Sequence, residues 1–296
     1  MSINFRSIIA FIGLIMLFGW FIYNLKTNPN FLSFSPKTMT TASPPNLEAS
    51  PEASPSPSPS PSPKPLTFAE MNALYGPCVY VPTLTYHHIE DLETAKAENH
   101  SSLAVAPDIF RQQMDYLRQQ GYSTAKMQDL LNFFDQGIPM PAKPVLLTFD
   151  DGYQDFADNA FPILQEFGFS ATVFLPTGLV ENPGYLSWST AQSISQSGLV
   201  LFANHTLSHH SAYTDETTFT KEVTLADQQL TEHGISNVKV FAYPYGSGNN
   251  QAGNILVQNG YTLAFTTNYG GTLCKQQRLF LPRIRIGNAP LNQYGL

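Results

Sequence analysis

The distribution of apolar residues divides the chain into three parts, of which the longest is residues 66–296. There, short apolar runs rich in β-branched residues alternate with longer helix-like segments, a pattern typical of parallel α/β folds. The predicted strands are Thr83–Tyr86, Val145–Phe149, Ala171–Leu175, Leu199–Ala203, Val238–Ala242, Thr262–Thr266 and Arg283–Ile286. The predicted helices are Asp108–Gln120, Met127–Gln136, Gln154–Phe167, Thr190–Ser197, Glu216–His233 and Asn249–Asn259. Seven strands with intervening helices over about 230 residues predict a barrel or near-barrel.

The N-terminal part of the sequence predicts a membrane anchor. Residues 7–25 carry no charge, and these 19 positions span roughly 28 Å as a helix, close to the hydrocarbon thickness of a bilayer. Arg6 and Lys26 flank the run, and Trp20 lies near its outer end. No small-x-small cleavage site follows, so we expect an uncleaved transmembrane anchor behind a cytoplasmic tail of residues 1–6. If the segment is cleaved instead, the protein is secreted.

The middle part, residues 26–65, is rich in Pro and Ser and contains the repeat SPSPSPSPSP. Proline fixes φ and removes hydrogen-bond donors, so this part predicts a disordered, extended linker without a core of its own. We therefore expect a single folded domain from residue 66 to residue 296, held away from a membrane.

Charge and cysteine content narrow the class of protein. Charged residues make up 12% of the chain and the formal net charge is -7, with no basic block, so a nucleic-acid partner is not expected. Cys78 and Cys274 lie near the two ends of the folded part. They pair in a disulfide or remain two buried thiols, and the sequence does not choose between these alternatives.

Polar motifs follow the predicted strands. Asp150 and Asp151 come after the second strand, and the sequence from His205 to His210 comes after the fourth. The carboxyl ends of parallel barrel strands open on one face, where active sites form. His205 and His209 are four residues apart, so one helical turn would place both imidazoles on the same side. One carboxylate and two imidazoles there predict an open, three-ligand site for a divalent cation.

These motifs resemble those of the polysaccharide deacetylase family, the NodB-homology domain. The resemblance rests on Thr148–Gly152, His205–His209 and Tyr243–Gly246 in this order. The opening Leu84–Ile89 and the closing Leu281–Ile284 look like the branch that contains poly-N-acetylglucosamine deacetylases. It covers residues from about 80 to 290, and it implies a distorted (β/α) barrel of seven or eight strands with metal-assisted hydrolysis.

The resemblance also implies roles for individual residues. Asp151, His205 and His209 are implied as metal ligands, with zinc expected and nickel, cobalt or iron also compatible. Asp150 is implied as the general base for the attacking water. The backbone N–H of Tyr245 is expected to hold the developing oxyanion. Thr206 or Ser208 is expected to orient a ligand.

The chain departs from the family pattern at two places. Where many members have an arginine that orients the catalytic aspartate, this chain has Ala242, and Arg283 is our hypothesised substitute. No histidine lies beyond His233, so the C-terminal histidine that usually protonates the leaving amine is missing. His87, His88 or water are the candidates for that proton.

Five aromatic or histidine positions carry weaker expectations. Trp188 resembles a position that lines the sugar groove, with half-buried packing as the equal alternative. Tyr245 and Tyr269 are candidates for stacking on sugar rings, although core packing is the default. His100 and His233 are expected to face solvent.

We therefore expect an enzyme that hydrolyses carbon–nitrogen bonds other than peptide bonds, removing N-acetyl groups from an N-acetylglucosamine-containing polysaccharide outside the cell membrane. The first alternative is an O-acetyl polysaccharide esterase of the xylan type, because an alkoxide leaving group differs from an amine in its need for a proton. The second is a catalytically inactive glycan-binding module.

Overall fold

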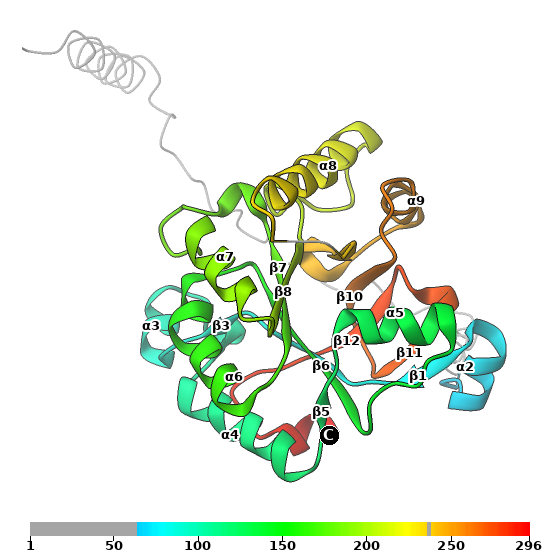
Figure 1. The fold of residues 1–296 in the computed structure, drawn as a ribbon, viewed down its shortest axis with the longest axis horizontal. Helices are drawn as coiled ribbons and strands as arrows, with labels where there is room; N and C mark the ends of the chain where they lie inside the picture. The colour runs from blue at the N-terminus through cyan, green and yellow to red at the C-terminus, as the bar shows by residue number, and fades with distance from the viewer. Residues whose placement is uncertain (1–63, 236–237) are drawn as a thin grey trace, which may run out of the picture. The chain divides into compact units, whose positions relative to one another are not determined.

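The folded part is built around a ring of seven parallel strands. The computed structural model describes residues 64–235 and 238–296. The ring strands are β2 (Thr83–Tyr86), β6 (Pro144–Asp150), β7 (Ala171–Leu175), β8 (Val200–Asn204), β9 (Val240–Ala242), β10 (Leu263–Tyr269) and β12 (Leu281–Arg285). They pair in the order β6, β7, β8, β9, β10, β12 and β2, and β2 closes the ring against β6 (Figure 1). The predicted α/β barrel is confirmed. A short strand, β5 (Ser123–Thr124), pairs with the beginning of β6.

Helices cover the outside of the ring. They are α4 (Pro107–Gln119), α5 (Met127–Gln136), α6 (Phe161–Phe167), α7 (Trp188–Gln196), α8 (Glu216–Glu232) and α9 (Asn250–Gln258). In α4 the buried residues Phe110, Met114 and Leu117 recur at helical spacing, so one face packs on the barrel. The side chain of Asp215 caps α8 by accepting from the Thr218 N–H.

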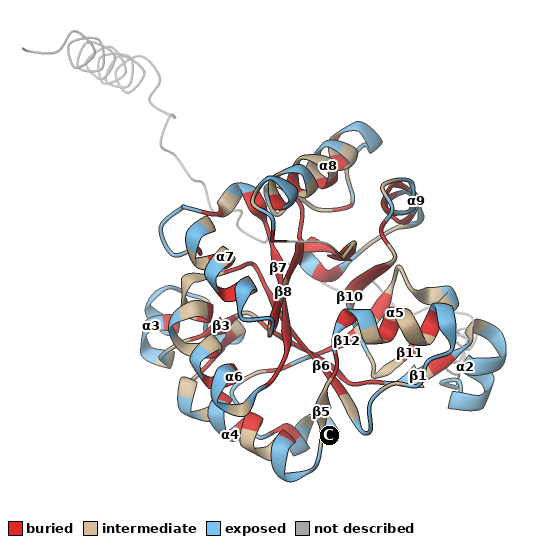
Figure 2. Cartoon of the chain, in the orientation of Figure 1, coloured by how far each residue is buried: buried red, intermediate tan, exposed pale blue. Residues whose placement is uncertain are grey.

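The strands are buried on both faces. In Figure 2 the ring strands are largely buried, apart from the exposed last three residues of β10, and many exposed residues lie on the outer faces of the helices. Side chains that point inward fill the ring, whereas those that point outward are covered by helices. The apolar runs in the sequence follow from this double burial, since neither face of a strand meets water.

One predicted helix begins in an unexpected form. The segment predicted as a helix from Gln154 to Phe167 starts as a π-helix, η2 (Phe156–Ala160), and continues as α6. The other predicted helices and the ring strands lie within a few residues of their expected bounds. π-Helical turns are rare and are frequent at functional sites.

Two groups of small elements were not predicted. One group is α2 (Phe68–Tyr75), β1 (Cys78–Tyr80) and β11 (Thr272–Cys274), which lie at the right in Figure 1. The other is β3 (His88–Ile89), α3 (Leu92–Ala97) and β4 (Ala104–Val105), of which α3 and β3 lie at the left. These elements are two to eight residues long, too short for their apolar pattern to show a period. The short 3-10 helices are Ser101–Leu103, Thr177–Leu179, Pro244–Gly246, Lys275–Gln277 and Leu291–Tyr294.

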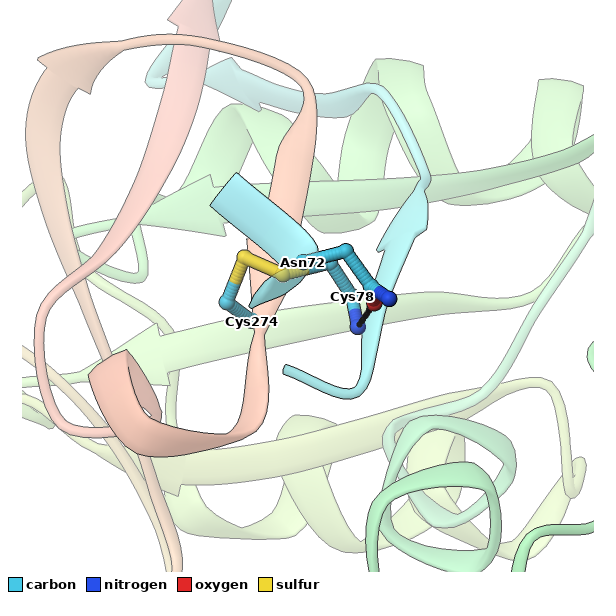
Figure 3. The surroundings of a disulfide bond; sticks show 3 residues. All are labelled: Asn72, Cys78 and Cys274. Atoms are coloured by element: carbon cyan, nitrogen blue, oxygen red, sulfur yellow. Dashed lines mark hydrogen bonds between the residues drawn. A yellow bond between two sulfur atoms is a disulfide. The ribbon is translucent and has the colours of Figure 1, made fainter. Parts of the chain in front are cut away.

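The two cysteines form a disulfide. Cys78 and Cys274 are register partners in the antiparallel pair β1–β11, and the backbone N–H of Cys78 donates to Asn72 Oδ1 (Figure 3). The bond joins residues 196 positions apart. Of the two alternatives that the sequence left open, the structure therefore selects the disulfide.

The predicted anchor and nearly all of the predicted linker lie outside the described residues. Within residues 64–235 and 238–296, no helix is long and apolar enough to cross a membrane.

Candidate functional site

The side chains of Asp151, His205 and His209 converge at the carboxyl ends of β6 and β8. Asp151 Oδ1 lies 3.4 Å from His205 Nε2 and 3.2 Å from His209 Nε2. The two imidazole rings lie 4.9 Å apart, centroid to centroid. We name these three residues the barrel cluster. The structure thus brings together the three side chains that the sequence proposed as metal ligands.

Hydrogen bonding fixes the orientation of His205. Its Nδ1 atom lies 2.7 Å from the carbonyl oxygen of Ala242. A carbonyl oxygen only accepts hydrogen bonds, so Nδ1 carries a proton and Nε2 is the ring nitrogen that faces Asp151. An imidazole held in this way by a backbone carbonyl is a common arrangement for metal ligands.

The donor set of the barrel cluster fits a divalent cation. Asp151 Oδ1 is buried and has no hydrogen-bond partner in the part of the chain that the structure describes. A buried carboxylate oxygen without a donor is costly, and ligation by a cation satisfies it. Burial opposes ionisation of Asp151, but the neighbouring imidazoles of His205 and His209 hold its pKa well below the usual value. Asp151 therefore presents a carboxylate.

Backbone strain concentrates at this site. Asp151, Thr206, His209 and Tyr245 all adopt positive φ, between 57° and 73°. Residues other than glycine rarely adopt such values, and a β-branched residue such as Thr206 does so only under strong constraint. Surrounding contacts supply that constraint: Asn204 Oδ1 accepts from the Thr206 N–H at 2.8 Å. Strained backbone of this kind clusters at functional sites.

The expected helical turn between His205 and His209 is wrong. The segment from His205 to Asp215 is a loop, and Thr206 and His209 are left-handed within it. Glu222 of α8 holds this loop by accepting from the N–H and the hydroxyl of Ser208, each at 2.8 Å. The two imidazoles meet because the loop folds back on itself, and not because a helix spaces them.

Asp150 and Arg283 form a buried bidentate pair inside the barrel. Arg283 donates from Nη1 to Asp150 Oδ1 at 2.8 Å and from Nη2 to Asp150 Oδ2 at 2.7 Å. Both side chains are almost inaccessible to solvent. Burial alone would raise the pKa of Asp150, but the Arg283 guanidinium, with smaller contributions from His205 and His87, holds the pKa below its usual value. The arginine that the sequence lacks at Ala242 thus has a counterpart, which reaches the aspartate from β12.

His87 directly follows β2, which pairs with β6, the strand that ends at Asp150. Burial lowers the pKa of His87, while the carboxylates of Asp150 and Asp151 oppose that shift. The imidazole of His87 is therefore close enough to interact electrostatically with both aspartates. His88, the neighbouring candidate, points to a different place: its Nδ1 lies 2.6 Å from Asp155 Oδ2.

The aromatic candidates are placed differently from one another. Tyr245 is exposed and packs edge-on against His209, with ring centroids 4.7 Å apart, so it borders the barrel cluster. Tyr269 is exposed at the end of β10. Trp188 packs against the core and stacks on His233 at 3.9 Å, and no described contact joins it to the barrel cluster. These contacts favour the packing alternative for Trp188.

The expectation that His100 and His233 face solvent is wrong. Both are half-buried. His100 stacks on His88 and bonds Glu90, while His233 stacks on Trp188. Sequence reasoning also missed Tyr153 and Tyr185, which pack together beside Asp151. Burial and the Asp151 carboxylate both raise the pKa of Tyr153. The only signal for Tyr153 was its position two residues after Asp151.

Comparisons with known proteins agree with this geometry. The Polysaccharide deacetylase family matches residues 137–264. The chain is 28% identical over 252 residues to the poly-beta-1,6-N-acetyl-D-glucosamine N-deacetylase of Escherichia coli K12, covering 70% of this chain and 36% of that enzyme. The chain thus spans about a third of that relative's length. An enzyme with the same name from Staphylococcus epidermidis is 25% identical over 199 residues, covering 62% of this chain and 68% of its own.

A solved structure is similar throughout the folded part. It is the Streptococcus pyogenes deacetylase PplD in complex with acetate, with 30% identity and a TM-score of 0.67. The alignment covers 73% of this chain and 98% of that one.

Proposed function

Because the chain belongs to the polysaccharide deacetylase family, we propose that it hydrolyses N-acetyl groups of a polysaccharide that contains N-acetylglucosamine, using a divalent cation held by Asp151, His205 and His209. The observation that carries the proposal is the buried, unpartnered oxygen of Asp151 between two imidazoles, beside the Asp150–Arg283 pair. The names of the E. coli and S. epidermidis relatives support a β-1,6-linked polymer as the substrate.

When bound, a divalent cation supplies electrophilic polarisation of the acetyl carbonyl and makes water acidic near neutral pH. The donor set leaves zinc as the first choice of ion. The chain's own residues carry the remaining steps.

Asp150 is proposed as the general base. Its lowered pKa keeps the carboxylate ionised at neutral pH, so it can accept the proton of the attacking water. Arg283 fixes both carboxylate oxygens and is proposed to aim the free lone pairs at the site. The backbone N–H of Tyr245 is proposed to stabilise the developing oxyanion, since the left-handed turn at Tyr245 presents this residue beside His209.

His87 is proposed to donate the proton to the leaving amine. No histidine follows His233, and His88 is occupied by Asp155, whereas His87 lies within the field of both catalytic-site aspartates. Tyr245 is also proposed to contact the sugar, because its ring is exposed at the site. The location outside a single-pass membrane anchor is proposed from the sequence of residues 1–65 alone.

The test uses the full chain, depleted of metal and reloaded with zinc, nickel or cobalt. Acetate and free amine are both measured after incubation with oligomers of β-1,6-linked N-acetylglucosamine. We expect metal-dependent release of both products in equal amounts. Release of acetate only from an O-acetylated glycan, without new amines, would move the protein to the esterase alternative. Metal binding without turnover of any glycan would leave the inactive binding module.

A further inference from the structure

A second group of metal-ligating side chains lies outside the barrel ring. It consists of His88 and Glu90 from β3 and its end, His100 from the turn after α3, and Asp155 from the residue before η2. We name these four residues the outer cluster. In Figure 1 it belongs to the region of α3 and β3. The reaction proposed above uses none of these four side chains.

The donor atoms of the outer cluster converge. His88 Nδ1 lies 2.6 Å from Asp155 Oδ2 and 3.6 Å from Glu90 Oε1. His100 Nε2 contacts the same Glu90 oxygen, Oε1. One atom each of His88, Glu90 and His100 lies within 4.8 Å of the others. Two ligands of one zinc ion, each about 2.1 Å from it, lie roughly 3–4 Å apart, so the spacing suits a shared ion.

Charge in this region favours a cation. Glu90, Glu98 and Asp155 all line one pocket of about 400 Å³, together with His88 and His100. Among the described residues, no lysine or arginine forms an ion pair with any of these three carboxylates. Within the described ranges, the imidazoles of His88 and His100 are the only side chains that form ion pairs with Glu90 and Asp155, and a divalent ion entering from the pocket would neutralise this negative charge.

The backbone is built to hold these side chains together. Asp155 Oδ1 accepts from the Ile89 N–H at 2.9 Å, and Asn159 donates to the Ile89 carbonyl at 2.7 Å. These two hydrogen bonds hold β3 against the start of η2. Asn99 adopts a positive φ of 64°, and the His100 N–H bonds the Ala95 carbonyl. That tight turn returns His100 to the cluster. The π-helix starts directly after Asp155, a placement typical of functional sites.

We propose that His88, Glu90, His100 and Asp155 form a second divalent-cation site, separate from Asp151, His205 and His209. Two imidazoles and two carboxylates suit zinc, and also cobalt, nickel, iron or manganese. The ion replaces the protons that the imidazole–carboxylate hydrogen bonds now hold, and these protons are released to solvent. His88 and His100 stack nearly parallel, 4.1 Å apart, so one ring tilts when both nitrogens bind the same ion.

A cation in the outer cluster would link the segment between β3 and β4, which contains α3 and His100, to the chain that follows Asp151. Tyr153 lies between the two sites: its ring stacks on His88 at 3.7 Å, and its backbone follows Gly152. The second ion would therefore stiffen one wall of the candidate active site. It is a positioning element, since no member of the outer cluster contacts the barrel cluster.

The test counts metal ions in the full chain. The protein is stripped with a chelator, dialysed against about micromolar free Zn²⁺, and its metal content is measured by mass spectrometry. We expect two Zn²⁺ per wild-type chain, one in His100→Ala, one in His209→Ala, and none in the double variant. His233→Ala is the matched control, because His233 is also half-buried and stacked but has no carboxylate partner among residues 64–235 and 238–296. It should retain two.

Each single variant carries its own check of folding, since the ion at the intact site remains only in a folded chain. Should His100→Ala bind none, Glu90→Gln, which keeps the side-chain volume, takes its place and is expected to bind one. The proposal is overturned if wild type binds a single ion that His209→Ala removes, or if His100→Ala and Glu90→Gln both retain two. Neither result depends on activity, so failure of the proposed reaction leaves this test intact.

Discussion

The barrel cluster and the outer cluster contain the same kinds of side chain but hold them differently. In the barrel cluster a backbone carbonyl takes the His205 Nδ1–H, and the Asp151 oxygen between the imidazoles has no donor. In the outer cluster the carboxylates of Asp155 and Glu90 bond the imidazoles directly. In the barrel cluster the ligand atoms converge without close hydrogen bonds between them, whereas in the outer cluster the imidazoles and carboxylates are hydrogen-bonded to each other.

This difference indicates how each cluster would respond to a metal. Ligand atoms that already converge need little rearrangement, so the barrel cluster is preorganised. The outer cluster must first give up imidazole–carboxylate hydrogen bonds and their protons, which makes its affinity more dependent on pH. Strained backbone at Asp151, Thr206 and His209 maintains the open arrangement.

The largest effect is expected from Asp150→Asn. The amide cannot accept the proton of water, so kcat should fall roughly 10²–10⁴-fold, while the metal content stays the same. Acetate release by the full chain measures the rate. The control is Asp158→Asn, an exposed carboxylate nearby in sequence, which should retain wild-type turnover. Full activity in Asp150→Asn would remove Asp150 from the role of base.

Arg283→Ala is expected to lower the free energy of unfolding by about 3–5 kcal/mol. Its loss leaves the Asp150 carboxylate buried without its partner. Denaturant unfolding measures the change. Arg285→Ala, two residues along the same strand and exposed, should change stability by only about 0.5 kcal/mol. Equal effects of the two substitutions would contradict the importance of the buried pair.

The Asp150–Arg283 pair makes both the stability and the reaction rate depend on pH. Because the folded-state pKa of Asp150 is lowered, its stabilisation is complete above the unfolded carboxyl pKa of about 3.9 and is lost as pH falls through the lower folded value. In Arg283→Ala the main opposition to burial is gone, and only the weaker effects of His205 and His87 remain, so the pKa of Asp150 rises. We therefore expect the fall in rate at low pH to begin at a higher pH in Arg283→Ala than in the wild type. If it begins at the same pH in both, a group other than Asp150 causes it.

Removing the disulfide tests whether the clusters depend on global stability. The double change Cys78→Ala and Cys274→Ala should lower the free energy of unfolding by about 2–5 kcal/mol, since a long loop is no longer closed in the unfolded chain. Thermal unfolding with and without reductant measures it. Reductant should destabilise only the wild type. Both clusters should bind metal as before at low temperature, and loss of either ion would show that they depend on the β1–β11 pair.

The smallest effect is expected from Glu222→Ala. It releases the loop that carries His209, so metal affinity of the barrel cluster should weaken about 10–100-fold, with the outer cluster unaffected. Competition with a chromogenic chelator measures the affinity. Glu216→Ala, exposed on the same helix, is the control. Equal weakening at both clusters would mean that the two sites are not independent.

Much of the barrel was predictable because its strands are buried on both faces and its helices are long. Strands Thr83–Tyr86 and Ala171–Leu175 and helix Met127–Gln136 were predicted to the residue. The barrel cluster was predictable because its residues follow strands directly, and strand ends in a parallel barrel share one face. The outer cluster was not predictable, since His88 lies in a strand of two residues and His100 in a turn, and neither shows a period.

The sequence by itself therefore determined the alternation of strands and helices and the positions of the chemical groups along it. Only the tertiary structure decided which groups meet. It paired Cys78 with Cys274, placed Arg283 against Asp150 across the barrel, and folded His209 back toward His205 without a helix. The physical reason is that periodicity records local burial. Contacts between distant residues depend on strand order, register and loop conformation, which no local pattern encodes.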